Sequence, residues 1–219
     1  MDLVSDFGKS GLVVHYISEM SNPFSEIDRL LRCHHTDDPA IVETMIEHCY
    51  AIVFGVAISI LRDPDDAKDA TQDTFLTVMT KLEQYEVGTN FRAWLYTIAV
   101  NTCRGYLRKR KAQANLKRLL MPLQAIAGRP PGPEASALRT ETRYHLWAAV
   151  NELDERHRIT VILRMGHGLS VREIAQVLGI REKTVYSRLY DAFRKLRHEL
   201  DGLVEVESIA DLQPTANQQ

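Results

Sequence analysis

The sequence has little of what marks secreted, membrane-spanning or metal-binding proteins. Only three cysteines occur among its 219 residues, and no CxxC or HxxxH spacing supports a metal site at Cys33-His34-His35 or at His48-Cys49. No secretory signal is visible, and the longest apolar run, 49–61, is shorter than the roughly 20 residues of a membrane span. We therefore expect a cytoplasmic protein without membrane insertion, metal or other cofactor.

The chain also lacks net charge, which is only −2, so its overall charge does not point to a nucleic-acid partner. The charges are, however, unevenly placed. Segment 63–90 has seven acidic residues against two basic ones, whereas segment 91–120 has eight basic residues and no acidic one. This division indicates two separate partners, one basic and one anionic.

Hydrophobic periodicity indicates helices, and we expect an all-α protein of two small helical domains. Long helices are predicted over 40–61, 63–82 and 91–111. A short helix is predicted after Ser21-Asn22-Pro23, and its buried face is Ile27, Leu30 and Leu31.

The predicted helix over 63–82 is expected to start at Asp63 as its cap, with Pro64 in its first turn. Its apolar stripe runs through Ala67, Ala70, Thr74, Val78 and Leu82, with Phe75 and Met79 beside it. The polar residues on the other side are Asp66, Asp69, Gln72 and Asp73. Taken alone, this side is an ordinary solvated helix face.

A polar loop, 81–90, precedes the next helix, and Asn90 is its expected cap. The far end of that helix is basic from Arg104 to Lys111, and Tyr96, Asn101 and Tyr106 are interleaved with it. Cations with stacking surfaces and amide donors suit single-stranded nucleic acid. Trp94, by its spacing, belongs to the core instead.

The segment Gly128–Pro133 cannot form regular structure and indicates a flexible linker between the two domains. The expected organisation is an N-terminal extension, partly disordered, over 1–38, a first domain over 39–112, a linker over 113–141, a second domain over 142–201 and a polar tail over 202–219. The second domain starts with Leu146, Ala149, Val150 and Leu153, followed by Ile159, Val161, Ile162 and Met165.

A helix-turn-helix is predicted from Gly168 to Leu200. Ser170 and Glu173 have the spacing of a capping box, and Gly179 can adopt the positive φ of a helix end. The second helix has a buried stripe of Val185, Leu189, Phe193 and Leu196. The residues off that stripe are Lys183, Thr184, Ser187 and Arg188, which are donor types that reach phosphates and guanine edges. The alternative is an amphipathic hairpin with a solvated basic face.

These motifs resemble the extracytoplasmic-function group of bacterial sigma-70-type sigma factors over roughly Ala40 to Leu200. The first domain carries DPDDAKDATQDTF and FRAWLYTIAVN with the basic ending LRKRK, and the second carries LDERHRITVILR, GLSVREIAQVLGI and KTVYSRLYDAFRKLR. Each motif is weakly specific by itself. Their order and spacing across a linker of family length make the resemblance strong.

The resemblance implies a region 2 helical bundle, a region 4 helix-turn-helix, and core RNA polymerase and promoter DNA as partners. The implied polymerase interface is Asp66, Asp69, Gln72 and Asp73. The implied contacts to melted minus-ten DNA are Glu86, Thr89, Asn90, Arg92, Asn101, Arg104 and Arg108. The implied contacts to minus-35 duplex are Arg181, Lys183, Thr184, Ser187 and Arg188. Whether an anti-sigma factor is a further partner stays open.

We therefore expect a sigma factor that directs promoter-specific initiation. One alternative is a stand-alone helix-turn-helix regulator, and another is a sigma mimic that sequesters an anti-sigma factor. An enzyme is not expected, because the sequence has no paired acid and base, no phosphate-binding glycine loop and only scattered histidines.

Overall fold

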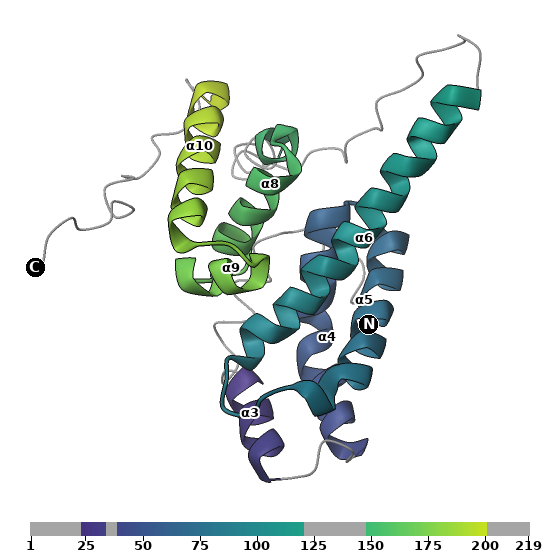
Figure 1. Cartoon of the computed structure of the whole chain (residues 1–219), viewed down its shortest axis with the longest axis vertical. Helices are drawn as coiled ribbons and strands as arrows, with labels where there is room; N and C mark the ends of the chain where they lie inside the picture. The colour runs from purple at the N-terminus through teal and green to yellow at the C-terminus, as the bar shows by residue number, and fades with distance from the viewer. Residues whose placement is uncertain (1–22, 34–38, 121–147, 201–219) are drawn as a thin grey trace, which may run out of the picture.

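The structure is a computed structural model that describes residues 23–33, 39–120 and 148–200 (Figure 1). Every regular element in these ranges is helical, which confirms the predicted all-α fold. In chain order they are α3 Pro23–Cys33, α4 Pro39–Leu61, α5 Pro64–Lys81, the 3-10 helix η1 Leu82–Gln84, α6 Phe91–Leu120, a helical stretch 148–152, α8 Glu155–Val161, the π-helix η2 Ile162–Gly166, α9 Val171–Leu178 and α10 Glu182–Leu200. His34, His35, most of the expected linker and the polar tail lie outside the described residues.

Helix α4 is the centre of the first helical unit, because α3, α5 and α6 all pack against it. Ile27 and Leu31 of α3 are buried there, as predicted. The window Val42–Leu61 of α4 is long and apolar enough for a membrane span, but 56% of it is buried within the protein.

Helix α5 starts as predicted. Arg62 ends α4 with a φ of 59°, and the Asp63 side chain accepts hydrogen bonds of 3.0 Å from the amides of Asp65 and Asp66. Pro64 occupies the first turn, where a missing N–H costs nothing. The apolar stripe is buried through Ala67, Ala70, Thr74, Phe75 and Val78, but Met79, expected beside it, is exposed.

Helix α6 is longer than predicted, since it ends at Leu120 and not near Lys111. Its C-terminal end projects beyond α4 and α5 (Figure 1), and the side chains over 108–116 are exposed. No burial guides the chain there. The helix continues because alanine, lysine, glutamine, arginine and leucine dominate the extension, and all are strong helix formers.

The second unit contains the predicted helix-turn-helix. The Ser170–Glu173 capping box is present, and Gly179 ends α9 with a φ of 63°. Val185, Leu189 and Leu196 are buried where α10 packs on α8 and α9. Two details differ from expectation. A π-helix interrupts the chain at Ile162–Gly166, and it leaves Met165 exposed and not in the core.

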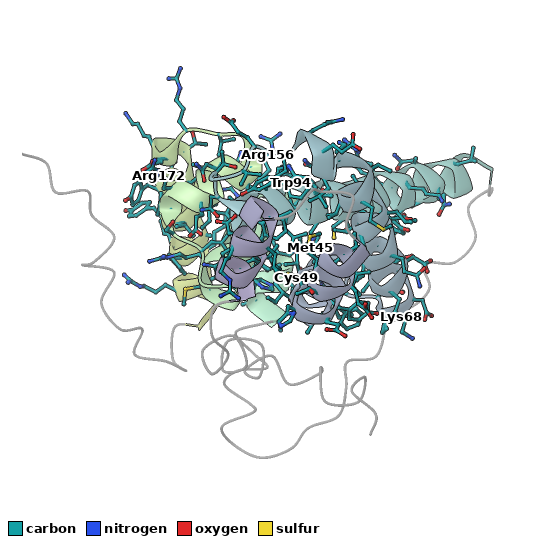
Figure 2. The ribbon with its side chains drawn as sticks, turned by 90° about the horizontal axis from the view of Figure 1, so that it is seen from below. Met45, Cys49, Lys68, Trp94, Arg156 and Arg172 are labelled. Carbon is teal, nitrogen blue, oxygen red and sulfur yellow. The ribbon has the colours of Figure 1, made fainter. Side chains whose placement is uncertain are left out.

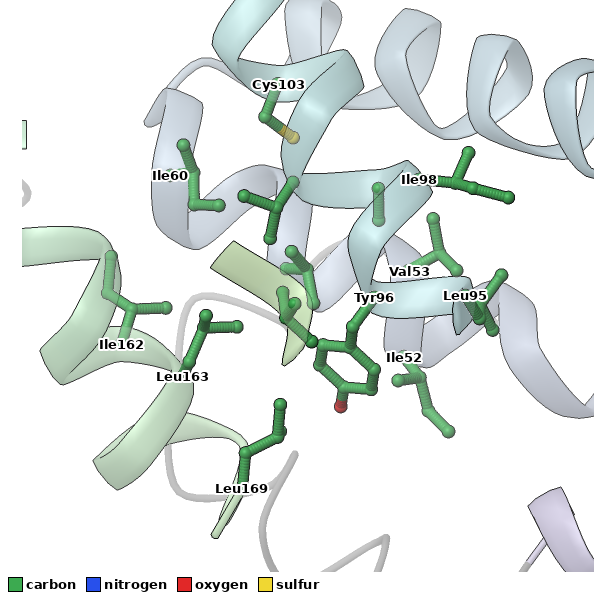
Figure 3. Close-up of a cluster of buried hydrophobic side chains, with 14 of the residues drawn as sticks. Ile52, Val53, Ile60, Leu95, Tyr96, Ile98, Cys103, Ile162, Leu163 and Leu169 are labelled. Carbon is green, nitrogen blue, oxygen red and sulfur yellow. The ribbon is translucent and has the colours of Figure 1, made fainter. Parts of the chain in front are cut away.

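The two helical units pack directly on one another, which the periodicity did not predict. Helix α9 contacts α6, and η2 contacts α4. Figure 3 shows Tyr96 pointing from α6 toward Leu163 and Leu169 of the second unit, with Ile52 and Val53 of α4 nearby. All five side chains are buried. One hydrophobic core therefore runs through both units and forms what we call the junction.

Candidate polymerase and nucleic-acid interfaces

The predicted acidic face lies on the solvent side of α5. Asp69, Gln72 and Asp73 are exposed and Asp66 is half-buried, whereas Ala67, Ala70, Thr71 and Thr74 face the core. The helix therefore presents the four residues together on one surface, which we call the acidic face.

Two members of the acidic face have partners on α6. The Tyr106 hydroxyl donates a 2.8 Å hydrogen bond to Asp73, and Nε of Arg110 lies 3.1 Å from Asp66. Partial burial, followed by the hydrogen bond and charge of Asp73, raises the pKa of Tyr106 to about 12. Such exposed pairs contribute little free energy, roughly 0–1 kcal/mol each, so a stronger partner can displace them.

Apolar side chains lie next to the acidic face, and the sequence did not reveal them as exposed. Leu76 is one helical turn beyond Asp73 and is 60% exposed, and Met79 follows one turn later at 48%. On the neighbouring α4, Tyr50 is 42% exposed, with its ring stacked on Phe75. Exposed apolar side chains bordered by polar residues are typical of a protein–protein interface.

Tyr85, which sequence reasoning did not select, anchors the loop before α6 to the core. Tyr85 is buried, and its hydroxyl lies 3.1 Å from Oδ1 of Asp28 in α3 and 2.9 Å from the carbonyl of Thr89. Its ring packs edge-on against Phe91. This anchor leaves the loop tip exposed, including the predicted contacts Glu86 and Thr89.

Asn90 and Arg92, both predicted DNA contacts, face the second unit. Asn90 caps α6 by accepting a 3.0 Å hydrogen bond from the amide of Ala93, and its Nδ2 lies 3.5 Å from Glu173. Arg92 donates a 2.6 Å hydrogen bond to the carbonyl of His167 and lies 3.6 Å from Glu173. The structure thus places these two residues in the junction.

Tyr96 does not offer a stacking surface, so that expectation is wrong. It is buried in the junction, and its hydroxyl lies 3.4 Å from Nδ1 of His167. Burial raises the pKa of the Tyr96 phenol, and burial together with the charge of Arg92 lowers the pKa of His167 to about 4. Both groups are therefore neutral at physiological pH.

The remaining predicted contacts on α6 divide into exposed and half-buried residues. Asn101 and Arg108 are exposed, and Asn101 lines a groove between α5 and α6 together with Asp73, Leu76 and Tyr106. Arg104 is half-buried beside Arg188 of α10. Burial, followed by the charges of Arg104 and Arg156, lowers the pKa of Arg188.

The helix-turn-helix presents most of its predicted contacts to solvent. Arg181, Lys183 and Ser187 are exposed, whereas Thr184 and Arg188 are half-buried. Arg172 and Gln176 of α9 line a shallow depression with Arg181 and Thr184, and both are further donors that the sequence reasoning missed. Figure 2 shows Arg172 of α9 and Lys68 of α5 on opposite sides of the molecule, so α9 and this part of α5 lie well apart.

Two of the three cysteines lie in the described ranges. Cys49 and Cys103 are free and buried, and burial raises the pKa of each thiol to about 12, so neither is a reactive thiolate. No group of three or more His, Cys, Asp or Glu residues suitable for a metal ion occurs among the residues that the structure describes.

These surfaces define a class of protein: an all-helical chain with an exposed acidic and apolar surface on its first unit and a helix-turn-helix in its second. Comparison with known families agrees. The sequence profile of sigma-70 region 2 matches residues 45–113, and that of sigma-70 region 4 matches residues 145–196.

Individual relatives extend over both units. The RNA polymerase sigma factor CarQ of Myxococcus xanthus is 34% identical over 158 residues, which cover 71% of this chain and 86% of CarQ. The ECF RNA polymerase sigma factor SigE of Mycolicibacterium smegmatis is 30% identical over 148 residues, which cover 68% of this chain and 57% of SigE.

Among solved structures, the sigma factor RpoE of Bartonella quintana, in complex with the anti-sigma factor NepR, superposes with a TM-score of 0.57 at 25% identity. The superposition covers 74% of this chain and 98% of RpoE. The chain belongs to the extracytoplasmic-function group of sigma-70-type RNA polymerase sigma factors. Members of this family are transcription initiation factors and not enzymes.

Proposed function

We propose that this cytoplasmic sigma factor joins core RNA polymerase through the acidic face of α5 and directs it to a promoter through α6 and the helix-turn-helix. The single observation that carries the proposal is the separation of the two surfaces. The acidic face is exposed on α5 and the donor-rich surface is exposed on α9 and α10, and Figure 2 shows Lys68 of α5 and Arg172 of α9 on opposite sides of the molecule.

The acidic face supports the polymerase contact because it combines charge with apolar anchors. Asp69 and Gln72 are exposed and form no hydrogen bond or ion pair with other described residues, and Leu76 and Met79 extend the surface along α5. Exposed charges of this kind orient a partner and speed its approach. Apolar side chains that become buried on binding supply most of the affinity. A basic, partly apolar helical surface on the polymerase is the matching partner.

The minus-ten contacts rest on the loop tip and the start of α6. Because Tyr85 holds the base of the loop, Glu86 and Thr89 are presented on a fixed backbone. A base flipped out of the duplex costs a few kcal/mol of unstacking, which a preformed pocket can offset. Arg108 and Asn101 would then hold the strand backbone along α6.

The minus-35 contacts rest on the start of α10, where Arg181 just before the helix and Lys183 and Ser187 in its first two turns lie at the surface. Side chains in this part of a recognition helix reach base edges in the major groove. Arg172 and Gln176 on α9 are placed to contact the adjacent phosphates.

The stand-alone regulator and the sigma mimic are less well supported. A regulator that binds operators by itself has no use for the acidic face, and a mimic that never touches DNA has no use for Lys183 and Ser187. The family membership favours the sigma factor over both.

The experiment is run-off transcription with purified chain, core polymerase and a library of promoter fragments that includes the region upstream of its own gene. We expect defined transcripts only when the chain and core polymerase are both present. Tight operator binding without core polymerase, and no transcripts with it, would support the regulator instead. Core binding without transcripts from any fragment would contradict the proposed function.

A further inference from the structure

The capping box of the helix-turn-helix occupies the DNA-binding end of α6. Oε2 of Glu173 accepts hydrogen bonds of 2.8 Å from the amide and the hydroxyl of Ser170, and this leaves Oε1 directed at the first unit. There it lies 3.5 Å from Nδ2 of Asn90 and 3.6 Å from Nη1 of Arg92. A single carboxylate thus serves both units.

We infer that this closed arrangement is autoinhibited, and that Glu173 takes on Asn90 and Arg92 the place of a promoter phosphate. The inference rests on the proposed function. A carboxylate and a phosphate both accept hydrogen bonds from guanidinium and amide groups, so the two compete for the same donors. We call the Asn90–Arg92–Glu173 set the latch.

Promoter geometry requires the latch to open. By their positions, the minus-ten and minus-35 elements are separated by about 25 base pairs along the duplex. At about 3.4 Å per pair, that separation is about 85 Å. In the closed form, only α9, about 12 Å long, and a tight turn separate Glu173 from the recognition helix. With Glu173 held 3.6 Å from Arg92, α6 and α10 cannot reach both elements at once.

Several contacts hold the closed form together with the latch. The side chains of Arg92 and Glu173 are only 23% and 17% exposed, and the guanidinium of Arg92 lies 5.7 Å from the ring centres of Phe24 and Tyr96. Burial would raise the pKa of Glu173, but the Ser170 hydrogen bonds and the charge of Arg92 outweigh it and lower that pKa. The carboxylate is therefore ionised and available to the latch at neutral pH.

Other contacts at the junction oppose closure, so the closed form is reversible. Arg104 of α6 acts on Arg188 of α10 as a like charge across the junction. Nη1 of Arg188 is buried and has no hydrogen-bond partner among the described residues, and the same holds for Nε of Arg92. DNA phosphates would satisfy these donors in the open form.

The test replaces Glu173 by glutamine. Glutamine also serves at this position of a capping box, so α9 keeps its cap while the latch loses its charge. Asp65→Cys in α5 and Arg194→Cys in α10, both at exposed positions, carry the donor and acceptor dyes, and Cys33→Ser prevents labelling at Cys33. Single-molecule energy transfer between the two dyes then reports the closed fraction of the full chain. Promoter affinity of the reconstituted holoenzyme is measured in parallel.

We expect Glu173→Gln to lower the closed fraction and to raise promoter affinity by about threefold to tenfold, because apparent affinity scales with the population that can bind. Glu155→Gln is the matched control. It removes the same charge from an exposed first-turn position of α8 and leaves both readouts unchanged.

If Glu173→Gln loses its helical circular dichroism, Asn90→Asp tests the latch from the other side. Aspartate still caps α6 but places a second carboxylate against Glu173, so the closed fraction falls. For Asn90→Asp only the closed fraction is measured, because the new carboxylate would also repel a promoter phosphate. An unchanged closed fraction in the folded variant, or opening of Glu173→Gln without a gain in promoter affinity, would overturn the inference. The energy-transfer measurement needs no polymerase, so a failed sigma-factor assignment would be seen separately, as wild-type chain that never binds core.

Discussion

Two surfaces of the first helical unit are used differently, although they belong to the same small bundle. The acidic face of α5 is open to solvent, and its partners Tyr106 and Arg110 come from the same unit. The start of α6 is covered by α9, and its polar groups are held by Glu173 and the carbonyl of His167. In the closed form the protein would therefore offer the proposed polymerase surface while it withholds part of the proposed DNA surface.

The difference follows from burial. The pairs on α5 and α6 are 30–46% exposed, where water and salt weaken them. The junction instead joins its polar contacts to a shared apolar core around Tyr96 and Leu163. We expect polymerase binding to precede promoter binding, because only the second event requires the covered surface.

The largest expected effect concerns the acidic face, which is the exposed surface in this comparison. Asp69→Lys combined with Asp73→Lys reverses the centre of the acidic face and places like charges against a basic partner. We expect core affinity to fall by about 100-fold, since like-charge contacts at an interface cost several kcal/mol. Fluorescence anisotropy with labelled chain and core polymerase measures the change.

A matched control keeps the charge change but moves it to another helix. Glu43→Lys with Glu47→Lys alters two exposed acids of α4, one turn apart in the same unit. Core affinity should stay within a fewfold of wild type. Equal losses in both variants would assign the effect to net charge and remove the acidic face from the interface.

The next effect concerns the covered side and comes from His167. Because its pKa is lowered to about 4 from an ordinary value of 6.5, the folded protein keeps this imidazole neutral while the unfolded chain protonates it below pH 6.5. The stability it provides is complete above pH 6.5 and is lost as the pH falls toward 4. We expect the free energy of unfolding to drop by about 2 kcal/mol between pH 7 and pH 5.

Urea unfolding at the two pH values measures this loss, and His167→Gln should remove most of the pH dependence. His48→Gln is the control, because His48 hydrogen-bonds to the Thr44 carbonyl within α4 and lies outside the junction. If His48→Gln flattened the profile instead, the junction histidine would not be the titrating group.

The third effect tests whether the helix-turn-helix stays open in the closed form, as its exposure indicates. Lys183→Ala removes an exposed cation from the first turn of α10, and we expect about a tenfold loss of promoter affinity and a salt slope lower by about one. Lys195→Ala, on the same helix but 3.8 Å from Asp154, serves as the control. Equal loss from both variants would mean that α10 contributes only general charge.

Local signals made much of the fold predictable. The Ser170–Glu173 spacing, Gly179 and Asp63-Pro64 each specify a helix end by short-range hydrogen bonds or allowed φ, and each appears in the structure. The acidic face could likewise be placed by helical spacing alone.

The junction could not be predicted in the same way, because it depends on contacts between segments about 70 residues apart. Spacing tells which face of α6 is buried against its neighbours but not that a second unit covers the opposite face. One signal was present. From Phe91 to Cys103 the helix is apolar nearly all round, which is typical of a helix buried on several sides and argued for a buried Tyr96.

The smallest expected effect concerns the Tyr106–Asp73 hydrogen bond at the acidic face. If the contacts of the acidic face are as weak as their exposure implies, Tyr106→Phe, which removes the 2.8 Å hydrogen bond to Asp73, should lower the free energy of unfolding by only about 0.5 kcal/mol. The affinity for core polymerase should stay level or rise by about twofold, because Asp73 no longer has to give up the Tyr106 hydrogen bond before it contacts the polymerase. Thermal melting and core-binding anisotropy measure the two quantities, with Tyr190→Phe on α10, 62% exposed, as the control for losing a surface phenol. A tenfold fall in core affinity specific to Tyr106→Phe would show that the phenol positions Asp73 for the polymerase. The acidic face and the start of α6 would then both be held in place by side-chain partners within the protein.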